Sequence, residues 1–381
     1  MPIRVLVVDD SAFMRRALSA IIGADDRFEL VGHAVNGKDG LDKIRSLNPD
    51  VVTLDVEMPE MDGLTALRSI VRSIKDPPAV LMCSSLTRDG SRVALDALAY
   101  GATDVIAKPT SAAGLHDSPD ARILLAKIRC AAAARTRRKL TSTDAPRQPT
   151  RGAGSSRRVL RSLPERAYEC IVIGSSTGGP PALEAILSGL LPSLSVPVII
   201  AQHMPPMFTQ SMAERLDGLT PLNVVHAETG MPLLPGTVYV GQGGKHVHVA
   251  RTPGGRSRIE VTGYPEGELY KPSVNVLFAS AAETFGGKVL GIMLTGMGDD
   301  GLEGSKALVA AGGVLLGQDE TSCVVYGMPK AVAEAGLVTA QLPPAELGEA
   351  IATLADADRK PGAACRYPPQ DASRDHGSPA A

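Results

Sequence analysis

The chain has 381 residues, of which 44% are hydrophobic and 21% charged, and its formal net charge is -2. This length predicts two or three domains, each apolar enough to bury an ordinary core. The nearly balanced charge provides no global basic field, so we expect no nucleic acid among the partners. The five cysteines are scattered without a C-x-x-C pair and support neither a disulfide framework nor a zinc knuckle.

The N-terminus runs directly into an apolar strand pattern without a signal peptide, and no apolar stretch is long enough to span a bilayer. We therefore expect a soluble cytoplasmic protein with no direct membrane insertion.

Residues 1–134 alternate short apolar runs with helical patterns, which predicts a doubly wound parallel sheet with helices on both faces. The expected strands are residues 5–8, 51–54, 80–83 and 105–107. In this architecture, functional groups lie beyond the carboxyl ends of the strands.

Five polar residues, Asp9, Asp10, Asp55, Ser84 and Lys108, stand at those four strand ends. Three converging carboxylates repel one another and need a cation, and oxygen-only ligands suit Mg²⁺. Asp55 could then accept a phosphoryl group, with Lys108 as a point charge and Ser84 as a hydrogen-bond donor to its oxygens. Any one aspartate could instead cap a helix, but the joint pattern favours a phosphoryl site.

The motifs Val-Val-Asp9-Asp10-Ser, Leu-Asp55-Val-Glu-Met-Pro, Ser84-Ser and Lys108-Pro resemble the response-regulator receiver domain, a flavodoxin-like fold. The resemblance implies Asp55 as the phosphorylation site, Asp9 and Asp10 as Mg²⁺ ligands beside it, and Ser84 and Lys108 as phosphate contacts.

Two further features follow from this resemblance. It implies a cis bond between Lys108 and Pro109. Receivers usually place a switch aromatic three residues before the lysine, whereas this chain has Val105 there. The usual aromatic switch is therefore not expected to operate in its standard form.

Residues 135–166 are rich in arginine, serine, threonine, glycine and proline, which predicts a flexible, self-repelling basic linker. A basic run could also contact nucleic acid or an acidic partner surface. The absence of interleaved aromatics and of a helix-turn-helix pattern favours the linker.

Residues 167–352 resume the strand–helix alternation and predict a second, Rossmann-like doubly wound parallel sheet, with an antiparallel hairpin near residues 245–262. The tail, residues 353–381, reads as disordered. The expected strands of this domain are residues 170–173, 196–201, 237–240, 247–249, 289–294 and 313–316.

A turn of the form G-x-S-x-G, residues 174–178, follows the first of these strands and precedes a helix expected at residues 181–191. A serine on such a sharp turn exposes its hydroxyl at the sheet edge, and the helix N-terminus offers N–H groups to an oxyanion. Ser176 is the candidate nucleophile and Ser175 the alternative. Such turns also cradle phosphates or simply bend the chain.

His203 and the acidic pair Asp299-Asp300 also follow strand ends, so one sheet edge could gather a serine, a histidine and an aspartate. Taken alone, a lone histidine is more often structural, and an Asp-Gly turn is common. A dinucleotide-binding site would need an acidic residue at the position of Gln202-His203, so this alternative is disfavoured. The serine turn also lacks the lysine that a Walker-type phosphate loop requires.

The motifs Gly-Ser-Ser176-Thr177-Gly, Gln-His203-Met-Pro, Lys-Pro-Ser-Val-Asn and Leu-Thr-Gly-Met297-Gly-Asp-Asp300-Gly resemble, in this order, the chemotaxis protein-glutamate methylesterases. The resemblance implies Ser176 as nucleophile, His203 as base and Asp300 as its partner. It places Thr177 and the Met297 backbone at the oxyanion site, and ranks Asp299 below Asp300.

The resemblance further implies hydrolysis of glutamate methyl esters on methylated chemoreceptors, with methanol released, and deamidation of receptor glutamines. It implies a chemotaxis-type histidine kinase as phosphodonor, Mg²⁺ in the receiver domain and no cofactor for ester hydrolysis. Phosphorylation of Asp55 would weaken the packing of the receiver over the catalytic edge. The alternative is a phosphorylation-controlled binding module whose serine loop holds an anionic ligand without turnover. The pair His246-x-His248 could also face one side of a strand as metal ligands, although no third ligand is evident.

Overall fold

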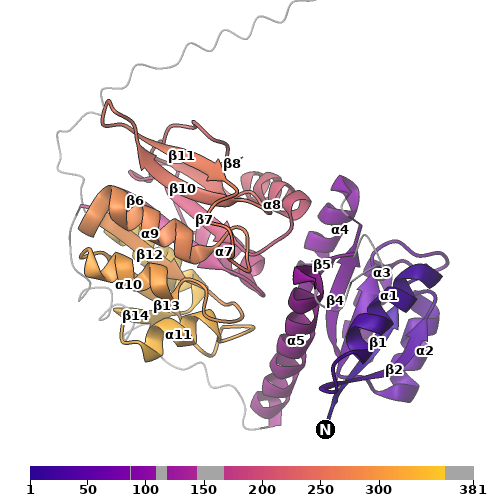
Figure 1. Ribbon diagram of the computed structural model, residues 1–381. Helices are drawn as coiled ribbons and strands as arrows, with labels where there is room; N and C mark the ends of the chain where they lie inside the picture. The colour runs from indigo at the N-terminus through magenta and orange to yellow at the C-terminus, as the bar shows by residue number, and fades with distance from the viewer. Residues whose placement is uncertain (86, 109–117, 144–166, 357–381) are drawn as a thin grey trace, which may run out of the picture.

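The computed structural model describes residues 1–85, 87–108, 118–143 and 167–356. They form two α/β domains, each built on a parallel sheet with helices against both faces (Figure 1). The predicted fold class is thereby confirmed. Residues 144–166, residues 357–381 and the Lys108–Pro109 bond lie outside the described part of the chain. No helix among the described residues is long and apolar enough to cross a membrane.

The first domain has a five-stranded parallel sheet in the order β2-β1-β3-β4-β5. Along the chain, β2 is added on one side of β1, and β3 and the later strands are added on the other side. The carboxyl ends of β1 and β3 therefore flank the crevice in which such parallel sheets bind ligands. The elements are β1 (Ile3–Val8), α1 (Ala12–Gly23), β2 (Phe28–Ala34), α2 (Gly37–Leu47), β3 (Val51–Asp55), α3 (Gly63–Ser73), β4 (Ala79–Ser84), α4 (Arg88–Ala99), β5 (Asp104–Ala107) and α5 (Pro119–Thr143).

Helix α5 continues nine residues past the boundary that we expected at residue 134, and the linker prediction for residues 135–143 is therefore wrong. Alanine, arginine and lysine are strong helix formers, so the basic composition does not end the helix. Arg135 is also anchored to the first domain. Its guanidinium lies 2.7 Å from the carboxylate of Asp50 and 2.9 Å from that of Asp76.

The second domain has a seven-stranded parallel sheet in the order β14-β13-β12-β6-β7-β9-β8. The strand order reverses between β6 and β12, which makes their carboxyl ends the expected ligand crevice. The sheet and its helices are β6 (Cys170–Ser175), α7 (Gly179–Leu187), β7 (Val198–Gln202), α8 (Pro206–Leu219), β8 (Asn223–His226), β9 (Thr237–Val240), α9 (Val274–Phe285), η2 (Gly286–Lys288), β12 (Val289–Met293), α10 (Leu302–Ala310), β13 (Val314–Gln318), α11 (Met328–Glu334), β14 (Ala340–Leu342) and α12 (Pro344–Asp356).

The expected hairpin is present as β10 (His246–Arg251) and β11 (Ser257–Thr262), which pair antiparallel in a separate two-stranded sheet. Other boundaries also differ from expectation. The disordered tail was predicted from residue 353, but helix α12 continues to Asp356, so that prediction is wrong for residues 353–356. Strand β7 begins at Val198 because Pro197 has no N–H to add to the ladder. Helix α7 begins at Gly179, with prolines in its first turn, and ends at Leu187, whereas we expected residues 181–191.

Three strands, β2, β8 and β14, were not predicted, and all three lie at the edge of a sheet. An edge strand needs a less continuous apolar pattern than a central one. In β2, for example, Glu29 and His33 are exposed between buried positions, so the sequence pattern is weak.

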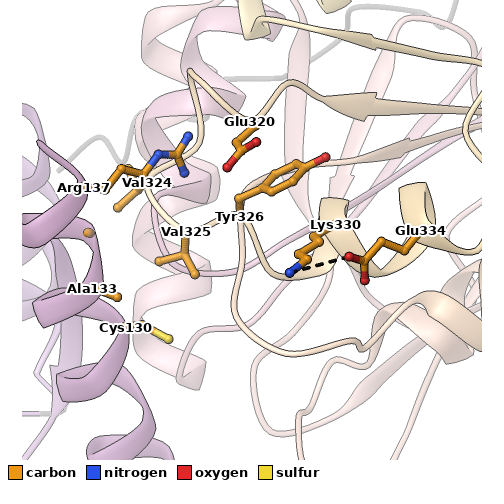
Figure 2. Close-up of a pocket in the computed structure, with 10 residues that line it drawn as sticks. Cys130, Ala133, Arg137, Glu320, Val324, Val325, Tyr326, Lys330 and Glu334 are labelled. Atoms are coloured by element: carbon orange, nitrogen blue, oxygen red, sulfur yellow. Dashed lines mark ion pairs between the residues drawn. The ribbon is translucent and has the colours of Figure 1, made fainter. Parts of the chain in front are cut away.

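The two domains pack against each other, with α4 and α5 of the first domain facing the second (Figure 1). Arg88 and Arg92 of α4 form ion pairs with Glu214 of α8, and Arg215 of α8 pairs with Asp96 of α4. A pocket of about 530 Å³ lies between α5 and residues 320–334 of the second domain (Figure 2).

Candidate functional site

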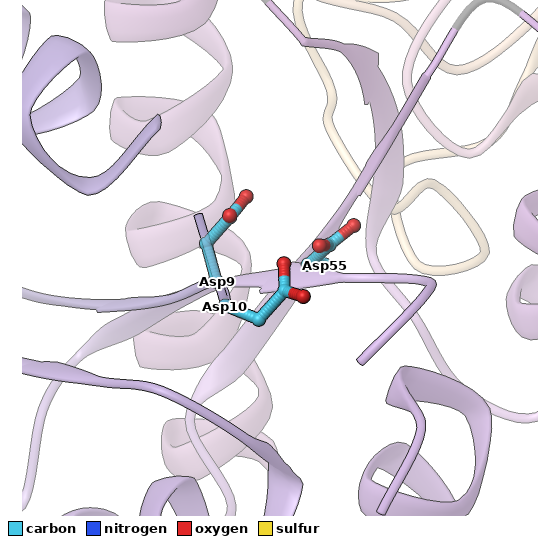
Figure 3. A group of neighbouring side chains, drawn as sticks. All are labelled: Asp9, Asp10 and Asp55. Atoms are coloured by element: carbon cyan, nitrogen blue, oxygen red, sulfur yellow. The ribbon is translucent and has the colours of Figure 1, made fainter. Parts of the chain in front are cut away.

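Three carboxylates of the first domain, Asp9, Asp10 and Asp55, converge at the ends of β1 and β3 (Figure 3). One ligand atom from each lies within 4.8 Å of the others. Asp9 and Asp55 are buried, whereas Asp10 is exposed. Parallel pairing of β1 with β3 brings the two strand ends together, as the sequence predicted.

Lys108 neutralises part of this negative charge. Its Nζ lies 3.0 Å from Oδ2 of Asp9 and 2.6 Å from Oδ2 of Asp55. Burial raises the pKa of Asp55 to about 6, although the hydrogen bond from Lys108 opposes the rise. The three carboxylates offer only oxygen ligands, and Lys108 offsets only part of their negative charge. The cluster therefore fits a divalent cation such as Mg²⁺, because hard cations prefer carboxylate ligands.

Ser84 ends β4 on the same sheet edge and is buried. Its hydroxyl donates to the carbonyl of Ser85 at 3.0 Å, and the Gly90 backbone is close, since a Cβ there would meet Ser84 Oγ at 2.6 Å. Within the described residues, the hydroxyl therefore has a local backbone partner, on the next residue of the chain. It can be redirected to an incoming phosphoryl oxygen.

In the second domain, the serine turn and His203 emerge side by side. Ser175 is in register with Gln202 across the β6–β7 pair, and the backbone N–H of His203 donates to the Ser175 carbonyl at 3.0 Å. Ser176 and His203 are thus the next residues on two neighbouring strands, which lie about 5 Å apart. Both side chains are buried.

The structure separates the two candidate serines. The Ser175 hydroxyl donates to Oε1 of Gln202 at 2.6 Å, and the amide of Gln202 donates to the Ser176 carbonyl at 2.8 Å. Ser175 is completely buried, and its hydroxyl is held by the Gln202 side chain. It therefore supports the turn, which leaves Ser176 as the candidate nucleophile of the two.

The turn after Ser176 requires glycine. Gly178 has φ +80, and a Cβ there would lie 2.6 Å from Val324. Gly296 of the loop after β12 packs directly on the serine, since its Cβ would lie 2.8 Å from that of Ser176. Close backbone approach at both glycines brings the serine turn against the β12 loop.

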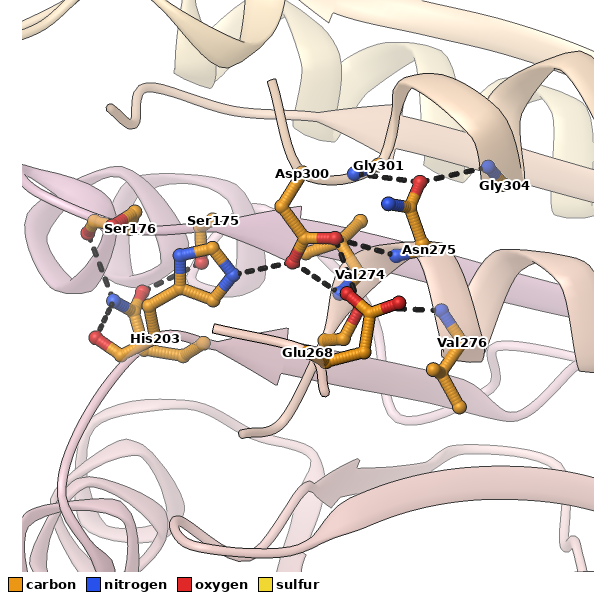
Figure 4. A network of polar contacts seen from close by, with 12 residues as sticks. Ser175, Ser176, His203, Glu268, Val274, Asn275, Val276, Asp300, Gly301 and Gly304 are labelled. Atoms are coloured by element: carbon orange, nitrogen blue, oxygen red, sulfur yellow. Dashed lines mark hydrogen bonds and ion pairs between the residues drawn. The ribbon is translucent and has the colours of Figure 1, made fainter. Parts of the chain in front are cut away.

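His203 is hydrogen-bonded to Asp300, with Nε2 2.7 Å from Oδ2 (Figure 4). Asp300 also accepts from the Ser273 hydroxyl at 2.9 Å and from two backbone N–H groups at the start of α9, those of Val274 at 2.7 Å and Asn275 at 3.0 Å. Burial acts against ionisation, but these hydrogen bonds outweigh it and hold the pKa of Asp300 below its usual value. Asp300 is therefore the candidate for an ionised group that orients the His203 ring.

The other ring nitrogen of His203, Nδ1, is buried and has no hydrogen-bond partner among the described residues. In Figure 4 the imidazole stands between Asp300 and Ser176. With Nε2–H donating to the carboxylate, Nδ1 is left as a proton acceptor on the serine side. Asp299, by contrast, is exposed and takes no part in this hydrogen bond.

The backbone N–H groups of Thr177 and Met297 are the candidate oxyanion donors, and they lie on either side of one hydrogen bond. Ser176 N–H donates to the Thr295 carbonyl at 3.0 Å, which ties the serine turn to the β12 loop. Thr177 and Met297 flank that junction, and within the described residues their backbone N–H groups donate to no acceptor. Both residues are buried, so free donors here are suited to stabilising a developing negative charge.

Sequence reasoning missed three residues around this site. Tyr270 stacks on the His203 ring, with centroids 4.1 Å apart and planes 9° apart. Gln202 bridges the two serines. Asp104 of the first domain accepts a hydrogen bond from the Thr177 hydroxyl. Two of them had a local signal, since Gln202 begins the Gln-His203-Met-Pro motif and Tyr270 immediately precedes the Lys-Pro-Ser-Val-Asn motif.

The pair His246 and His248 is not arranged for metal binding. His246 receives the Ser273 N–H at Nδ1 and contacts the Pro265 carbonyl through Nε2, while His248 Nε2 contacts Thr262 and the Tyr264 carbonyl. In the described part of the chain, the only cluster of three or more acidic, histidine or cysteine ligands is that of the first domain.

Comparison with known proteins relates each domain of the chain to a known family. Residues 171–351 match the family model described as CheB methylesterase, and residues 5–119 match that of the response regulator receiver domain. The chain is 44% identical to a protein-glutamate methylesterase/protein-glutamine glutaminase 1 of Oleidesulfovibrio alaskensis, over 92% of this chain and 98% of that one. It is 41% identical to a protein of the same name from Vibrio vulnificus, with the same coverage. A crystal structure of the Thermotoga maritima CheB methylesterase catalytic domain is 36% identical, covers 50% of this chain and 100% of that one, and has a TM-score of 0.48.

Proposed function

This chain belongs to the CheB methylesterase family, and we propose from that premise that it hydrolyses glutamate methyl esters on chemoreceptors and releases methanol. The same site would remove ammonia from receptor glutamines, since an amide carbonyl undergoes the same attack. The observation that carries the proposal is the state of His203. One of its ring nitrogens is bound to an ionised carboxylate, and the other is buried and unpartnered beside the serine turn.

The reaction proceeds in two halves. Ser176 Oγ attacks the ester carbonyl carbon, and Nδ1 of His203 takes the hydroxyl proton. The carbonyl oxygen becomes an oxyanion and accepts hydrogen bonds from the N–H groups of Thr177 and Met297. When the carbon–oxygen bond to the methoxy group breaks, the imidazolium gives its proton to that oxygen and methanol leaves.

Water completes the turnover. His203 takes a proton from a water molecule, whose oxygen attacks the acyl carbon, and the proton then returns to Ser176 as the glutamate carboxylate departs. Throughout, Asp300 holds the imidazole in one tautomer and stabilises its charged form.

Methanol release from methylated receptor, measured with a small phosphodonor and Mg²⁺, tests this proposal. Ser176→Ala should lower the rate by roughly 10⁴-fold or more, as for other serine nucleophiles. Ser175→Ala is the matched control, because it removes a buried hydroxyl one residue away and should retain far more activity. Near-normal methanol release by Ser176→Ala would assign the nucleophile elsewhere.

We further propose that Asp55 is phosphorylated by a chemotaxis-type histidine kinase. A carboxylate oxygen of Asp55 attacks the phosphorus of the donor phosphohistidine, and the imidazole leaves. Asp9, Asp10 and Asp55 would hold Mg²⁺, which, when bound, offsets the negative charge of the phosphoryl group. Lys108 and Ser84 would then contact its oxygens.

Phosphorylation would control hydrolysis through the packing of the two domains. The Thr177 hydroxyl, in the oxyanion turn, donates to Asp104 at the start of β5, and Asp104 is paired with Lys127 of α5 at 2.8 Å. Both charges are buried, so the receiver contacts the catalytic turn through a rigid pair. Phosphorylation of Asp55 would weaken this packing and open the crevice, an equilibrium that a few kcal/mol can shift.

A further inference from the structure

The imidazole of His203 is held at two places. Asp300 holds its edge through Nε2, and the ring of Tyr270 covers one of its faces. The two rings are nearly parallel, with planes 9° apart and centroids 4.1 Å apart. His203 is only 5% exposed, so this face contact is part of what separates the imidazole from water. A hydrogen bond to Asp300 alone would still let the ring tilt about that bond.

Tyr270 belongs to the same short segment that fixes Asp300. Three residues further on, the Ser273 hydroxyl donates to Asp300, and the first backbone N–H groups of α9 do the same. The segment that enters α9 therefore sets the carboxylate and the covering ring together. A shift of this segment would move both supports of the imidazole at once.

We propose that Tyr270 is a positioning residue, whose aromatic face keeps the His203 imidazole aligned between Asp300 and Ser176 and stabilises its positively charged form. This inference rests on the proposed ester hydrolysis, in which His203 becomes an imidazolium when it takes the serine proton. The face of an aromatic ring carries negative electrostatic potential and attracts a cation that lies against it. The interaction is stronger in the charged intermediate than in the resting state, so it raises kcat more than it lowers KM.

The aromatic face, and not the phenol hydroxyl, provides this effect. Burial is the main reason that the pKa of Tyr270 is raised to about 12, so the ring is neutral throughout the physiological range. Its hydroxyl makes no hydrogen bond within the described residues, so phenylalanine should replace it. A side chain that only excluded water would be replaced equally well by leucine. These two substitutions therefore separate an aromatic role from a merely space-filling one.

The test uses the full chain with phosphodonor and Mg²⁺, so that docking of the receiver does not limit the rates. Tyr270→Leu should lower kcat for methanol release roughly 5- to 30-fold, the value of a desolvated cation–π contact, and leave KM within about twofold. Tyr270→Phe should recover most of that loss. Tyr264→Leu is the matched control, because Tyr264 lies in the same loop but is 69% exposed, and its kcat should equal that of the unmodified chain.

A second readout does not depend on hydrolysis. In protein with isotope-labelled histidine, the ring protons of His203, assigned with His203→Gln, should move downfield in Tyr270→Leu because the ring-current shift is lost. They should stay near their original positions in Tyr270→Phe and Tyr264→Leu. Circular dichroism and the melting temperature establish that each variant is folded.

Unchanged kcat in Tyr270→Leu, an equal loss in Tyr270→Phe, or His203 resonances that do not respond would each overturn the positioning role. If the resonances respond as expected while the unmodified chain releases no methanol, the stacking is correct and the proposed hydrolysis is wrong.

Discussion

Reversing one charge on α8 should release the catalytic domain from its receiver. Glu214 accepts hydrogen bonds from two arginines of α4, Arg88 and Arg92, and the second of these contacts measures 2.7 Å. The hydrogen bond from Arg92 is the main cause that lowers the pKa of Glu214, so the carboxylate is ionised throughout the neutral range. The variant Glu214→Arg removes both pairs and places another cation directly beside Arg88 and Arg92.

The expected loss of docking free energy depends on how exposed these three side chains are to solvent. The side chain of Glu214 is 30% exposed, and those of Arg88 and Arg92 are 54% and 53% exposed. Such solvent-screened pairs contribute about 0.2–1 kcal/mol each, and like charges oppose binding by a similar amount. Because all three side chains are solvent-exposed, we take the lower half of these ranges, so the two lost pairs and two new like-charge contacts of Glu214→Arg should weaken docking by about 1–2 kcal/mol, or roughly 5- to 30-fold.

Methanol release without phosphodonor measures the undocked fraction. We expect Glu214→Arg to raise this basal rate roughly 5- to 30-fold, up to the activated rate as a ceiling, and to shrink the response to phosphodonor by the same factor. Glu303→Arg is the matched control, because it reverses one member of an exposed ion pair within α10. Combining Glu214→Arg with Arg88→Glu and Arg92→Glu should restore repression.

An unchanged basal rate in Glu214→Arg, together with a full response to phosphodonor, would refute the reasoning that these pairs hold the receiver against the catalytic domain. Added salt gives a second check. Since the pairs are exposed, 0.5 M NaCl should raise the basal rate of the unmodified chain and leave that of Glu214→Arg nearly constant.

Three further outcomes are expected. Asp300→Asn should lower kcat for methanol release by roughly 10⁴-fold, because an amide favours the wrong tautomer of His203, and a loss below tenfold would contradict an orienting carboxylate. In Mg²⁺-free buffer, Asp55→Asn should raise the free energy of unfolding at pH 7.5. The pKa of Asp55 is raised to about 6, so its charge destabilises the fold above that pH, and the gain should fade as pH drops through 6 and vanish near 4. The contact with Lys108, which an uncharged amide weakens, limits the gain to about 1–2 kcal/mol, and a gain independent of pH in thermal melts would contradict this explanation. Finally, EDTA should abolish the stimulation of methanol release by phosphodonor without altering the basal rate, and a basal rate that falls with Mg²⁺ removal would place a cation in the hydrolytic site.

The sequence predicted both parallel sheets and the edge at which each site lies. This was possible because central strands of such sheets are continuous apolar runs, and because polar groups that follow them must collect at one edge. Asp9, Asp10 and Asp55 were grouped on this basis, and so were Ser176 and His203. The edge strands β2, β8 and β14 were missed because a half-exposed strand has no such run.

Features that depend on tertiary contact could not be read from local patterns. The extension of α5 is stabilised by Arg135, whose partners Asp50 and Asp76 are distant in the sequence. The hydrogen bond between Thr177 and Asp104 crosses the domain interface, and the stacking of Tyr270 on His203 joins two loops of the catalytic domain. Neither pairing leaves a periodicity or a motif, so only the folded arrangement identifies it.

A serine-reactive methylphosphonate gives the most direct test of the central claim, that His203 activates the hydroxyl of Ser176. After incubation of the full chain with the reagent, phosphodonor and Mg²⁺, peptide mass spectrometry locates the adduct. We predict one adduct, on Ser176, formed in the unmodified chain and in Ser175→Ala but lost in His203→Gln. An adduct on Ser175, or labelling of Ser176 that persists unchanged in His203→Gln, would contradict the account.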